Sequence, residues 1–182
     1  MSQFVIYITL EKYLAEWAHH SLGSPIVFPA QSNENAIIRT FIQKLPKGTI
    51  PIMNDGNMTA ISIPDSKAKP AREYNYIGVR GQKAIRECIK DLFKRNLWNE
   101  IGCLSDSGVG VNALICAWCE MHGIDIDRME TVRQAFYRMR EAYTKKGINL
   151  RNFSREKSRQ EEHNLYKPHK PAQTCTNTNN HY

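Results

Sequence analysis

The sequence of 182 residues contains no long run of apolar side chains. A helix needs about 20 consecutive apolar residues to cross a bilayer, and no stretch approaches that length, so we expect no transmembrane segment. Residues 1–8 lack the basic start of a secretory signal peptide, and Glu11 and Lys12 follow soon afterwards. These absences predict a soluble, cytoplasmic protein without a membrane partner.

The cysteines do not form the even, regularly spaced set of a disulfide framework. There are five, Cys88, Cys103, Cys116, Cys119 and Cys175, and reduced thiols in an intracellular protein are the simpler interpretation. Cys116 and Cys119 make a CxxC pair with His122 three residues further on, but a structural zinc site needs a second ligand pair in a suitable loop. We therefore expect small buried side chains here, with no metal and no cofactor.

No arrangement of residues typical of catalysis is present either. The glycine-rich segment 78–81 lacks the lysine and hydroxyl pair of a phosphate-binding loop, and His19-His20 sits where histidine favours a helix end. Glu11, Glu16 and Glu34 have no partner carboxylate that the sequence can place. The sequence thus predicts a protein that is not an enzyme, while a nuclease with its site in the N-terminal half stays open as an alternative.

What is present predicts an α+β fold with a helical C-terminal part. Apolar, β-branched or alternating runs near 3–8, 26–28 and 59–63 predict a small sheet, and residues 74–77 are a further strand candidate. Helical spacing of apolar residues predicts helices over about 10–22, capped by Thr9, and about 33–45, begun by Ser32 or Asn33. We expect an α+β scaffold over 1–79, a helical subdomain over 80–150 and a disordered, basic and polar tail over 151–182.

Three helices in series are predicted between about 81 and 146. The first covers about 81–101, the second follows possible caps at 105–108 and runs to His122, and Gly123 breaks the chain. Asp127 and Glu130 fit a capping box that opens the third helix, which Gly147 closes. Two helices joined by a short glycine-containing turn are the outline of a helix-turn-helix, whose second helix enters the major groove of DNA.

The last predicted helix has one narrow apolar stripe and a basic outer surface. The stripe consists of Met129, Val132, Phe136, Met139 and Tyr143. Guanidinium groups match guanine edges and amides match adenine edges, and we expect the side chains nearest the bases to be Arg133, Gln134, Tyr137 and Arg138. The residues expected at phosphates are Lys145, Lys146 and Arg151, and Arg140 is a further expected nucleic-acid-binding residue.

The net charge of +7 favours a polyanionic partner, and its distribution supports the same interpretation. The helix predicted over about 81–101 has six basic residues outside its apolar stripe or just before its start: Arg80, Lys83, Arg86, Lys90, Lys94 and Arg95. Lys67, Lys69 and Arg72 lie in a predicted exposed loop that is either simply solvated or in contact with phosphates, and the tail adds Arg155, Lys157 and Arg159.

Residues 117–124, with the sequence AWCEMHGI, and residues 130–140, with the sequence ETVRQAFYRMR, resemble the broad class of helix-turn-helix DNA-binding proteins. They are also loosely similar to uncharacterised small proteins of bacterial mobile elements and phages. The resemblance covers about residues 81–150 and implies DNA binding linked to transcription or replication.

The working hypothesis is a non-catalytic DNA-binding protein, with RNA as a further possible ligand and a homodimer as a possible assembly. The alternative is a structural or protein-interaction module, such as a phage assembly or inhibitor protein, whose cations meet an acidic protein surface. The salt dependence of binding to a random duplex separates the two, because only nucleic acid releases condensed counterions.

Overall fold

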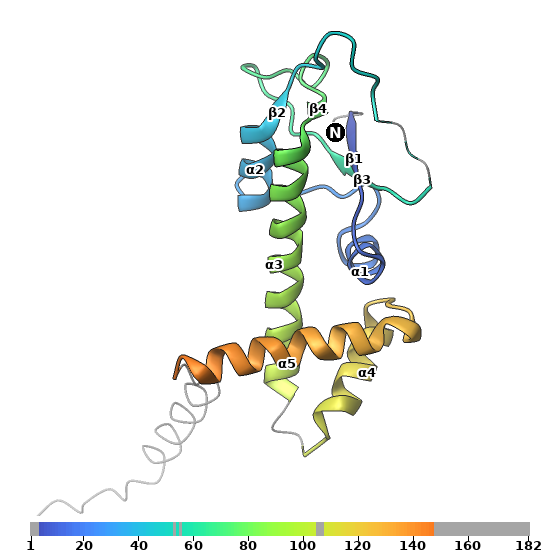
Figure 1. The fold of residues 1–182 in the computed structure, drawn as a ribbon, viewed down its shortest axis with the longest axis vertical. Coiled ribbons are helices and arrows are strands. Elements are labelled where there is room, and N and C mark those ends of the chain that lie inside the picture. The colour runs from blue at the N-terminus through green and yellow to red at the C-terminus, as the bar shows by residue number, and fades with distance from the viewer. Residues whose placement is uncertain (1–3, 53, 55, 105–107, 148–182) are drawn as a thin grey trace, which may run out of the picture. The chain divides into compact units, whose positions relative to one another are not determined.

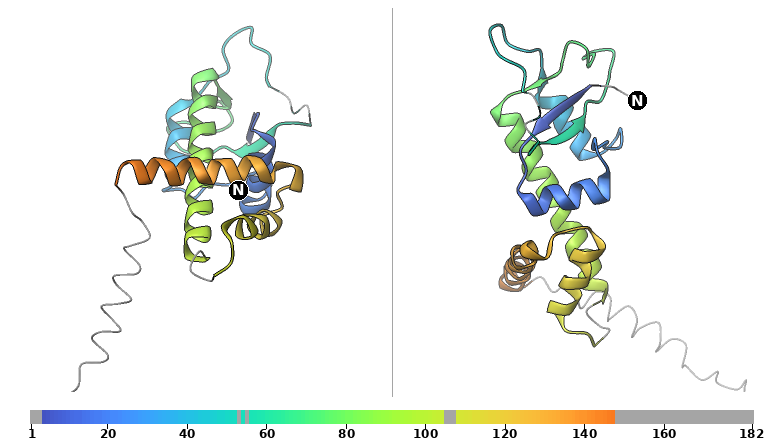
Figure 2. Two further views of the ribbon diagram at one scale, coloured as in Figure 1. Left: turned by 60° about the horizontal axis from the view of Figure 1, so that its bottom comes forward. Right: turned by 90° about the vertical axis from the view of Figure 1, so that its right-hand side faces the viewer.

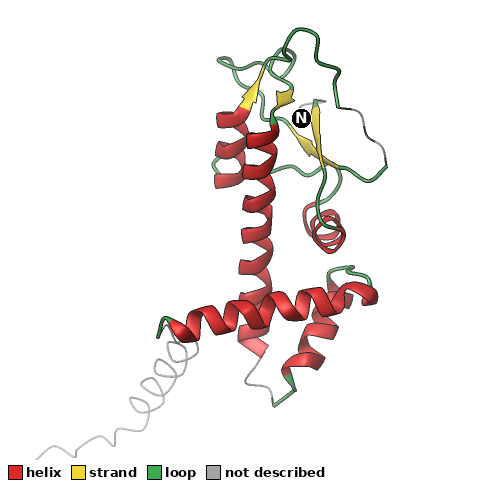
Figure 3. Cartoon of the chain, viewed as in Figure 1, coloured by secondary structure: helices red, strands yellow, loops and turns green. Residues whose placement is uncertain are grey.

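The computed structural model describes residues 4–52, 54, 56–104 and 108–147 (Figures 1 and 3). The fold is α+β with a helical C-terminal part, as the sequence predicts. The described elements are, in order, β1 (Val5–Ile8), α1 (Lys12–Leu22), α2 (Asn33–Phe41), β2 (Ile42–Gln43), β3 (Thr59–Ser62), β4 (Tyr76–Ile77), α3 (Val79–Leu104), α4 (Val111–Met121), the 3-10 helix η1 (Ile126–Arg128) and α5 (Met129–Lys145).

The chain divides into two units, Met1–Arg140 and Glu141–Tyr182, and the boundary falls inside α5. In the first unit, apolar side chains from both sides of the predicted boundary at residue 80 form one core cluster. The tail predicted over 151–182 lies outside the described residues. Among the helices that the structure describes, none is long and apolar enough to cross a membrane.

The first sheet pairs β1 with β3 in antiparallel register, with Val5 opposite Ser62. The strand predicted over 26–28 is reduced to a single parallel bridge between Ile26 and Ile61. Ile26 donates its amide to Ala60 and accepts from Ser62, at 2.9 and 2.8 Å. Pro25 and Pro29 flank this segment and have no amide hydrogen to donate, which explains why the pairing does not extend into a longer strand.

α2 ends earlier than the helical pattern predicts, because the residues that follow it belong to the second sheet. The apolar spacing predicts a helix to about residue 45, but α2 ends at Phe41, and Ile42 is extended with ψ 136°. Ile42 and Gln43 instead form β2 and pair antiparallel with Ile77 and Tyr76 of β4. Pairing with a distant strand therefore overrides the local helical spacing, as tertiary contacts often do.

The two N-terminal helices begin differently. The prediction that Thr9 caps α1 is wrong, because the N-cap is Glu11 and no side-chain hydrogen bond caps that helix. The prediction for α2 is confirmed at Ser32, whose side-chain oxygen accepts from the amide of Asn35 at 3.1 Å. Such a bond satisfies one of the amides that the first turn of a helix leaves without a partner.

Replacing Ser32 by alanine is expected to lower the free energy of unfolding by about 1 kcal/mol, because the Asn35 amide loses its acceptor. Thr40→Ala on the same helix is the control, since the Thr40 hydroxyl is exposed and bonds only the Ala36 carbonyl four residues back. Urea denaturation followed by circular dichroism measures both. Equal stability of the two variants would show that Ser32 does not act as a cap.

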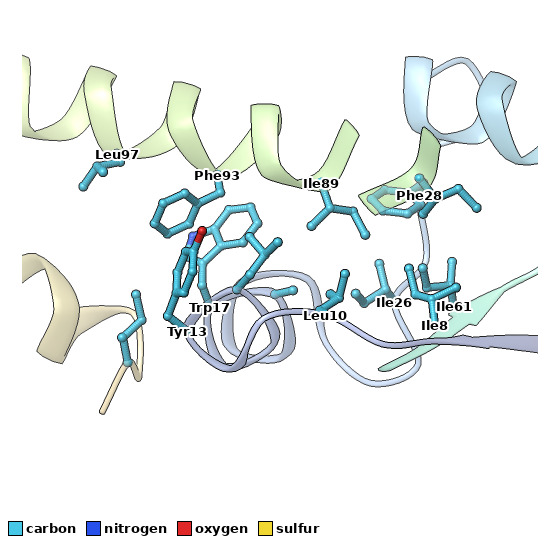
Figure 4. Packing of buried hydrophobic residues seen from close by; sticks show 14 of the residues in the cluster. Ile8, Leu10, Tyr13, Trp17, Ile26, Phe28, Ile61, Ile89, Phe93 and Leu97 are labelled. Carbon is cyan, nitrogen blue, oxygen red and sulfur yellow. The ribbon is translucent and has the colours of Figure 1, made fainter. Parts of the chain in front are cut away.

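The core is centred on α3, which contacts α1, α2 and α4 (Figures 1 and 2). Phe93 in the middle of α3 is 1% exposed and receives three aromatic rings edge-on. Tyr13 and Trp17 of α1 lie 5.3 and 5.4 Å away between ring centroids, and Trp118 of α4 lies at 5.6 Å. Figure 4 shows the α1 side of this cluster and its continuation through Ile89 to the sheet residues Ile8, Ile26 and Ile61.

Candidate nucleic-acid interface

α4, η1 and the first part of α5 form the corner that the sequence predicts as a helix-turn-helix. Gly123 turns the chain in the left-handed region, with φ 66°, and the Ile124 amide bonds the Cys119 carbonyl at 2.9 Å. The predicted capping box is wrong, because Asp125 accepts from the Asp127 amide and caps η1 instead. At the start of α4 the N-cap is Gly110, and residues 105–107, where the sequence predicts side-chain caps, are not among the described residues.

Few side chains hold α5 against the rest of its unit. Val132 and Phe136 are its buried residues, and Phe136 stacks on Trp98 of α3 at 5.5 Å between ring centroids. Met129 and Met139 are partly buried and pack against the core, whereas Tyr143, predicted as part of the same stripe, is 38% exposed. Most of the circumference of α5 is therefore open to solvent.

A carboxylate on α1 holds the turn before α5 in place. Glu16 accepts from the guanidinium of Arg128 at 3.0 Å and from the amide of Asp125 at 3.2 Å, through different oxygens. Both side chains of the ion pair are partly shielded from solvent. The start of α5 is thus fixed to the first helix of the chain.

A second carboxylate, on α3, positions α4. Glu100 accepts from the indole nitrogen of Trp118 at 2.7 Å, lies 2.8 Å from Nε2 of His122, and accepts from Asn96, which in turn accepts from Trp17. Burial raises the pKa of Glu100, but the hydrogen bonds from His122, Asn96 and Trp118 outweigh burial and leave that pKa below its ordinary value. We name this set of side chains the Glu100 network.

Two of the side chains expected nearest the bases have a partner on the helix itself. Arg133 donates twice to Glu130, at 2.7 and 2.9 Å, and Gln134 donates to the same carboxylate at 3.2 Å. The bonds from Arg133 and Gln134 lower the pKa of Glu130. The third, Tyr137, is 38% exposed and donates its hydroxyl to Asn112 on α4 at 3.1 Å.

The other predicted binding residues that the structure describes are exposed cations. Arg138 and Arg140 are exposed in the first unit, and Arg138 forms no ion pair within the described part of the chain. In the second unit, Lys145 pairs with Glu141 at 2.7 Å, and Lys146 is exposed. Arg151 lies outside the described residues. The structure thus places Arg133, Gln134, Tyr137 and Arg138 together on the outer surface of one exposed helix.

Comparisons with protein-family models, curated proteins and solved structures give no match. The side chains of the candidate interface determine the chemistry that it offers. It offers guanidinium, amide and phenol groups as hydrogen-bond donors, together with Glu130, which neutralises part of the positive charge. The sequence pattern assigned Glu130 to a capping box and not to Arg133, and it gave no role to Asn112. The spacing of Glu130 and Arg133, three residues apart in a helix, is a local signal that could have identified the first, whereas no local signal identifies Asn112.

The basic outer surface predicted for α3 is largely engaged by other groups. Lys90 pairs with Glu11, Lys94 with Asp91, and Arg95 with Glu34. Arg86 donates to the carbonyl of Thr9 at 3.1 Å. The middle of α3 is therefore electrically balanced, and only Arg80 and Lys83 in its first turns have no such partner among the described residues.

The thiols of Cys88, Cys116 and Cys119 are at least partly buried. Cys119 is buried on α4 and Cys116 is half-buried, and burial raises the pKa of Cys119 to about 11. Burial likewise raises the pKa of Cys88 on α3 to about 11. A thiol with a raised pKa is a poor nucleophile at neutral pH. The described residues contain no group of three or more His, Cys, Asp or Glu side chains that could hold a metal ion.

Proposed function

We propose that the chain is a nucleic-acid-binding protein that reads duplex DNA with α5. The observation that carries this proposal is the exposure of α5, a 17-residue helix whose buried residues are Val132 and Phe136 alone. It follows a glycine turn after α4, so α4, η1 and α5 have the order of a helix-turn-helix. A helix presented in this way can enter a major groove, which admits an α-helix.

The side chains on the exposed surface of α5 suit this ligand. Arg133 and Arg138 can donate in pairs to guanine edges or to phosphates, and Gln134 can bond an adenine edge. The residues proposed to bind the sugar–phosphate backbone are Arg140, Lys145, Lys146 and Arg151, and transcription or replication-linked regulation is the proposed role. Tyr137 and Asn112 form a polar pair between α5 and α4 that can turn toward a phosphate together.

The carboxylate beside Arg133 sets how strongly α5 attracts phosphate. An exposed ion pair contributes at most about 1 kcal/mol, so a phosphate can replace Glu130 as the partner of Arg133. The displaced carboxylate then repels the incoming anion. Glu130 therefore weakens binding without blocking it, and its removal has an effect opposite in sign to the removal of a cation.

Glu130→Gln is expected to strengthen binding to a random-sequence duplex, and Arg138→Ala is expected to weaken it. The slope of log Kobs against log salt changes by about 0.9 for every phosphate that the protein neutralises. Arg138→Ala should therefore make the slope less steep by about that amount if Arg138 binds a phosphate. Fluorescence anisotropy of a labelled duplex, titrated between about 50 and 200 mM salt, gives both quantities.

The matched control is Glu120→Gln, which makes the same change of net charge as Glu130→Gln at an exposed α4 position with no ion-pair partner in the described residues. If Glu120→Gln strengthens binding as much as Glu130→Gln does, the effect comes from net charge and not from α5. If the wild-type protein shows no salt-dependent affinity for duplex, the proposed function is wrong.

A protein-interaction role is the second candidate, and exposed apolar side chains at the α4–α5 corner favour it. Met121 is 58% exposed and Ile126 is 70% exposed, close together in the sequence on either side of the turn. Such residues suit a structural or inhibitory contact with another protein, or a homodimer. The duplex titration separates the candidates, because a protein-binding module shows no steep salt dependence on random DNA.

A further inference from the structure

Positive charge is concentrated in a second region, residues 39–83. Eight basic residues stand there against the three acidic residues Asp55, Asp65 and Glu73, a net charge of +5. The next segment, 84–127, has four basic and seven acidic residues, a net charge of −3. The cations of residues 39–83 are therefore separated from those of α5 by a stretch of opposite sign.

The end of α2, β2, β4 and the first turns of α3 lie together at one end of the first unit (Figures 1 and 2). β2 pairs with β4. Phe41 at the end of α2 lies close to Gly81, and a Cβ atom built on Gly81 would be 2.7 Å from the Cβ of Phe41. Lys69 reaches back from its loop and donates to the carbonyls of Arg39 and Ile42. Lys44 pairs with Glu73 across the same end.

Six cations in this region are exposed and have no ion-pair partner among the described carboxylates. They come from α2, two loops and α3, and we call them the basic end: Arg39, Lys47, Lys67, Arg72, Arg80 and Lys83. In the middle of α3, by contrast, three cations pair with a carboxylate nearby. Within the described part of the chain, the basic end thus combines six exposed cations that form no ion pair.

Two of the six lie near the start of α3, and Arg80 is in its first turn. Arg80 and Lys83 lie in the first turns of α3, whose first turn contains no acidic residue. A cation in the first turn of a helix is unfavourable, because the helix dipole already places partial positive charge there. An anionic partner removes this repulsion and adds the attraction of all six cations.

We propose that the basic end is a second phosphate-binding surface for the same nucleic acid. This inference rests on the proposed function for its ligand but uses a different part of the molecule. Gly81 lies at the basic end of α3, and Trp98 is the α3 residue on which α5 packs. The two residues are 17 positions apart on α3, or about 26 Å along its axis. A polyphosphate chain can extend over this axial length. Without base recognition, the basic end adds affinity that does not depend on sequence.

The test removes three loop cations that make no ion pair in the described part of the chain, in the variant Lys47→Ala, Lys67→Ala and Arg72→Ala. Its matched control changes Lys12, Lys90 and Lys94 to alanine, with the same loss of charge in the middle of the first unit. With the loop variant, the slope of log Kobs against log salt for a random duplex should become less steep by about 0.9 for each phosphate that is no longer neutralised. The control should keep the wild-type slope, and circular dichroism checks that both variants fold.

Each other outcome has a distinct meaning. If the loop variant keeps the wild-type slope while Arg138→Ala reduces it, the basic end is not a phosphate-binding surface and the proposed role of α5 stands. If the loop and control variants lose affinity equally, net charge explains the effect and the inference is wrong. If the loop variant loses binding to vesicles containing phosphatidylserine but binds duplex normally, the surface fits lipid and not nucleic acid, and the inference is again wrong.

Discussion

Replacing Phe93 by alanine is expected to lower the free energy of unfolding by about 3–5 kcal/mol, the range for phenylalanine-to-alanine substitutions in cores. Phe93 is 1% exposed, and the rings of Tyr13, Trp17 and Trp118 meet it edge-on. The substitution leaves a cavity among three large rings whose helices cannot all move inward. Phe93 is also where α1, α3 and α4 meet, so the loss affects the whole first unit.

Two further variants make this prediction specific. Phe93→Leu fills most of the cavity but loses the aromatic contacts, so we expect a loss of about 1–2 kcal/mol. Val79→Ala removes an apolar side chain that is 81% exposed on the same helix, and its effect should stay within about 0.5 kcal/mol. Urea denaturation monitored by circular dichroism measures all three. A loss below about 1 kcal/mol for Phe93→Ala would contradict the central place of this residue in the core.

Local patterns in the sequence predict most of the helices correctly. The spacing of Tyr13, Leu14, Trp17 and Ala18 indicates the face of α1 that is in fact buried, because that face follows from helix geometry alone. The end of α2 could not be predicted in the same way. Ile42 continues the apolar spacing of the helix, yet it pairs with Ile77, which is 35 positions away in the sequence. A pattern within one segment contains no information on such a partner.

In the candidate site, too, local patterns predict some features, whereas contacts between residues distant in the sequence cannot be predicted from them. The position of Arg133, Gln134 and Arg138 away from the apolar stripe of α5 follows from the helical pattern, and in the structure Gln134 and Arg138 are exposed and Arg133 is half-exposed. The residues that position α4 and α5 could not be found in this way. Glu16 is 112 positions from Arg128, and Trp17 is 79 positions from Asn96, so these bonds exist only once the chain has folded.

The Glu100 network determines how firmly α4 is attached to α3. The indole nitrogen of Trp118 belongs to a side chain that is 1% exposed, so the loss of Glu100 would leave a largely buried donor without its acceptor. Asn96 links the same carboxylate to Trp17 of α1, and His122 links it to Ser21 at 3.2 Å. One carboxylate on α3 therefore connects the helix before the turn to the first helix of the chain.

Glu100→Ala is expected to lower the free energy of unfolding by about 2–3 kcal/mol, because a buried donor that loses its acceptor costs about 1–3 kcal/mol and bonds to a charged group are the stronger ones. The carboxylate of Glu100 is 38% exposed, so water replaces part of the loss for His122 and Asn96. Glu87→Ala, at an exposed position of the same helix, is the control and should change stability little. Equal effects of the two substitutions would exclude a structural role for Glu100.

The pH dependence of stability tests the charge of Glu100 separately from its shape. Its pKa is lower in the folded protein than its ordinary value of 4.5, so the folded state favours the carboxylate. This contribution is fully present above about pH 4.5 and is lost as the pH falls through the lowered pKa, because the unfolded state then binds the proton more readily. Glu100→Gln keeps the shape but has no such contribution. Its stability should be lower than that of the wild type at neutral pH, and the two curves of stability against pH should converge in acid.

The other carboxylates with lowered pKa values, such as Glu11, are present in both proteins and cancel in the difference. Parallel curves from neutral pH down to acid would mean that the ionised form of Glu100 is not favoured by folding.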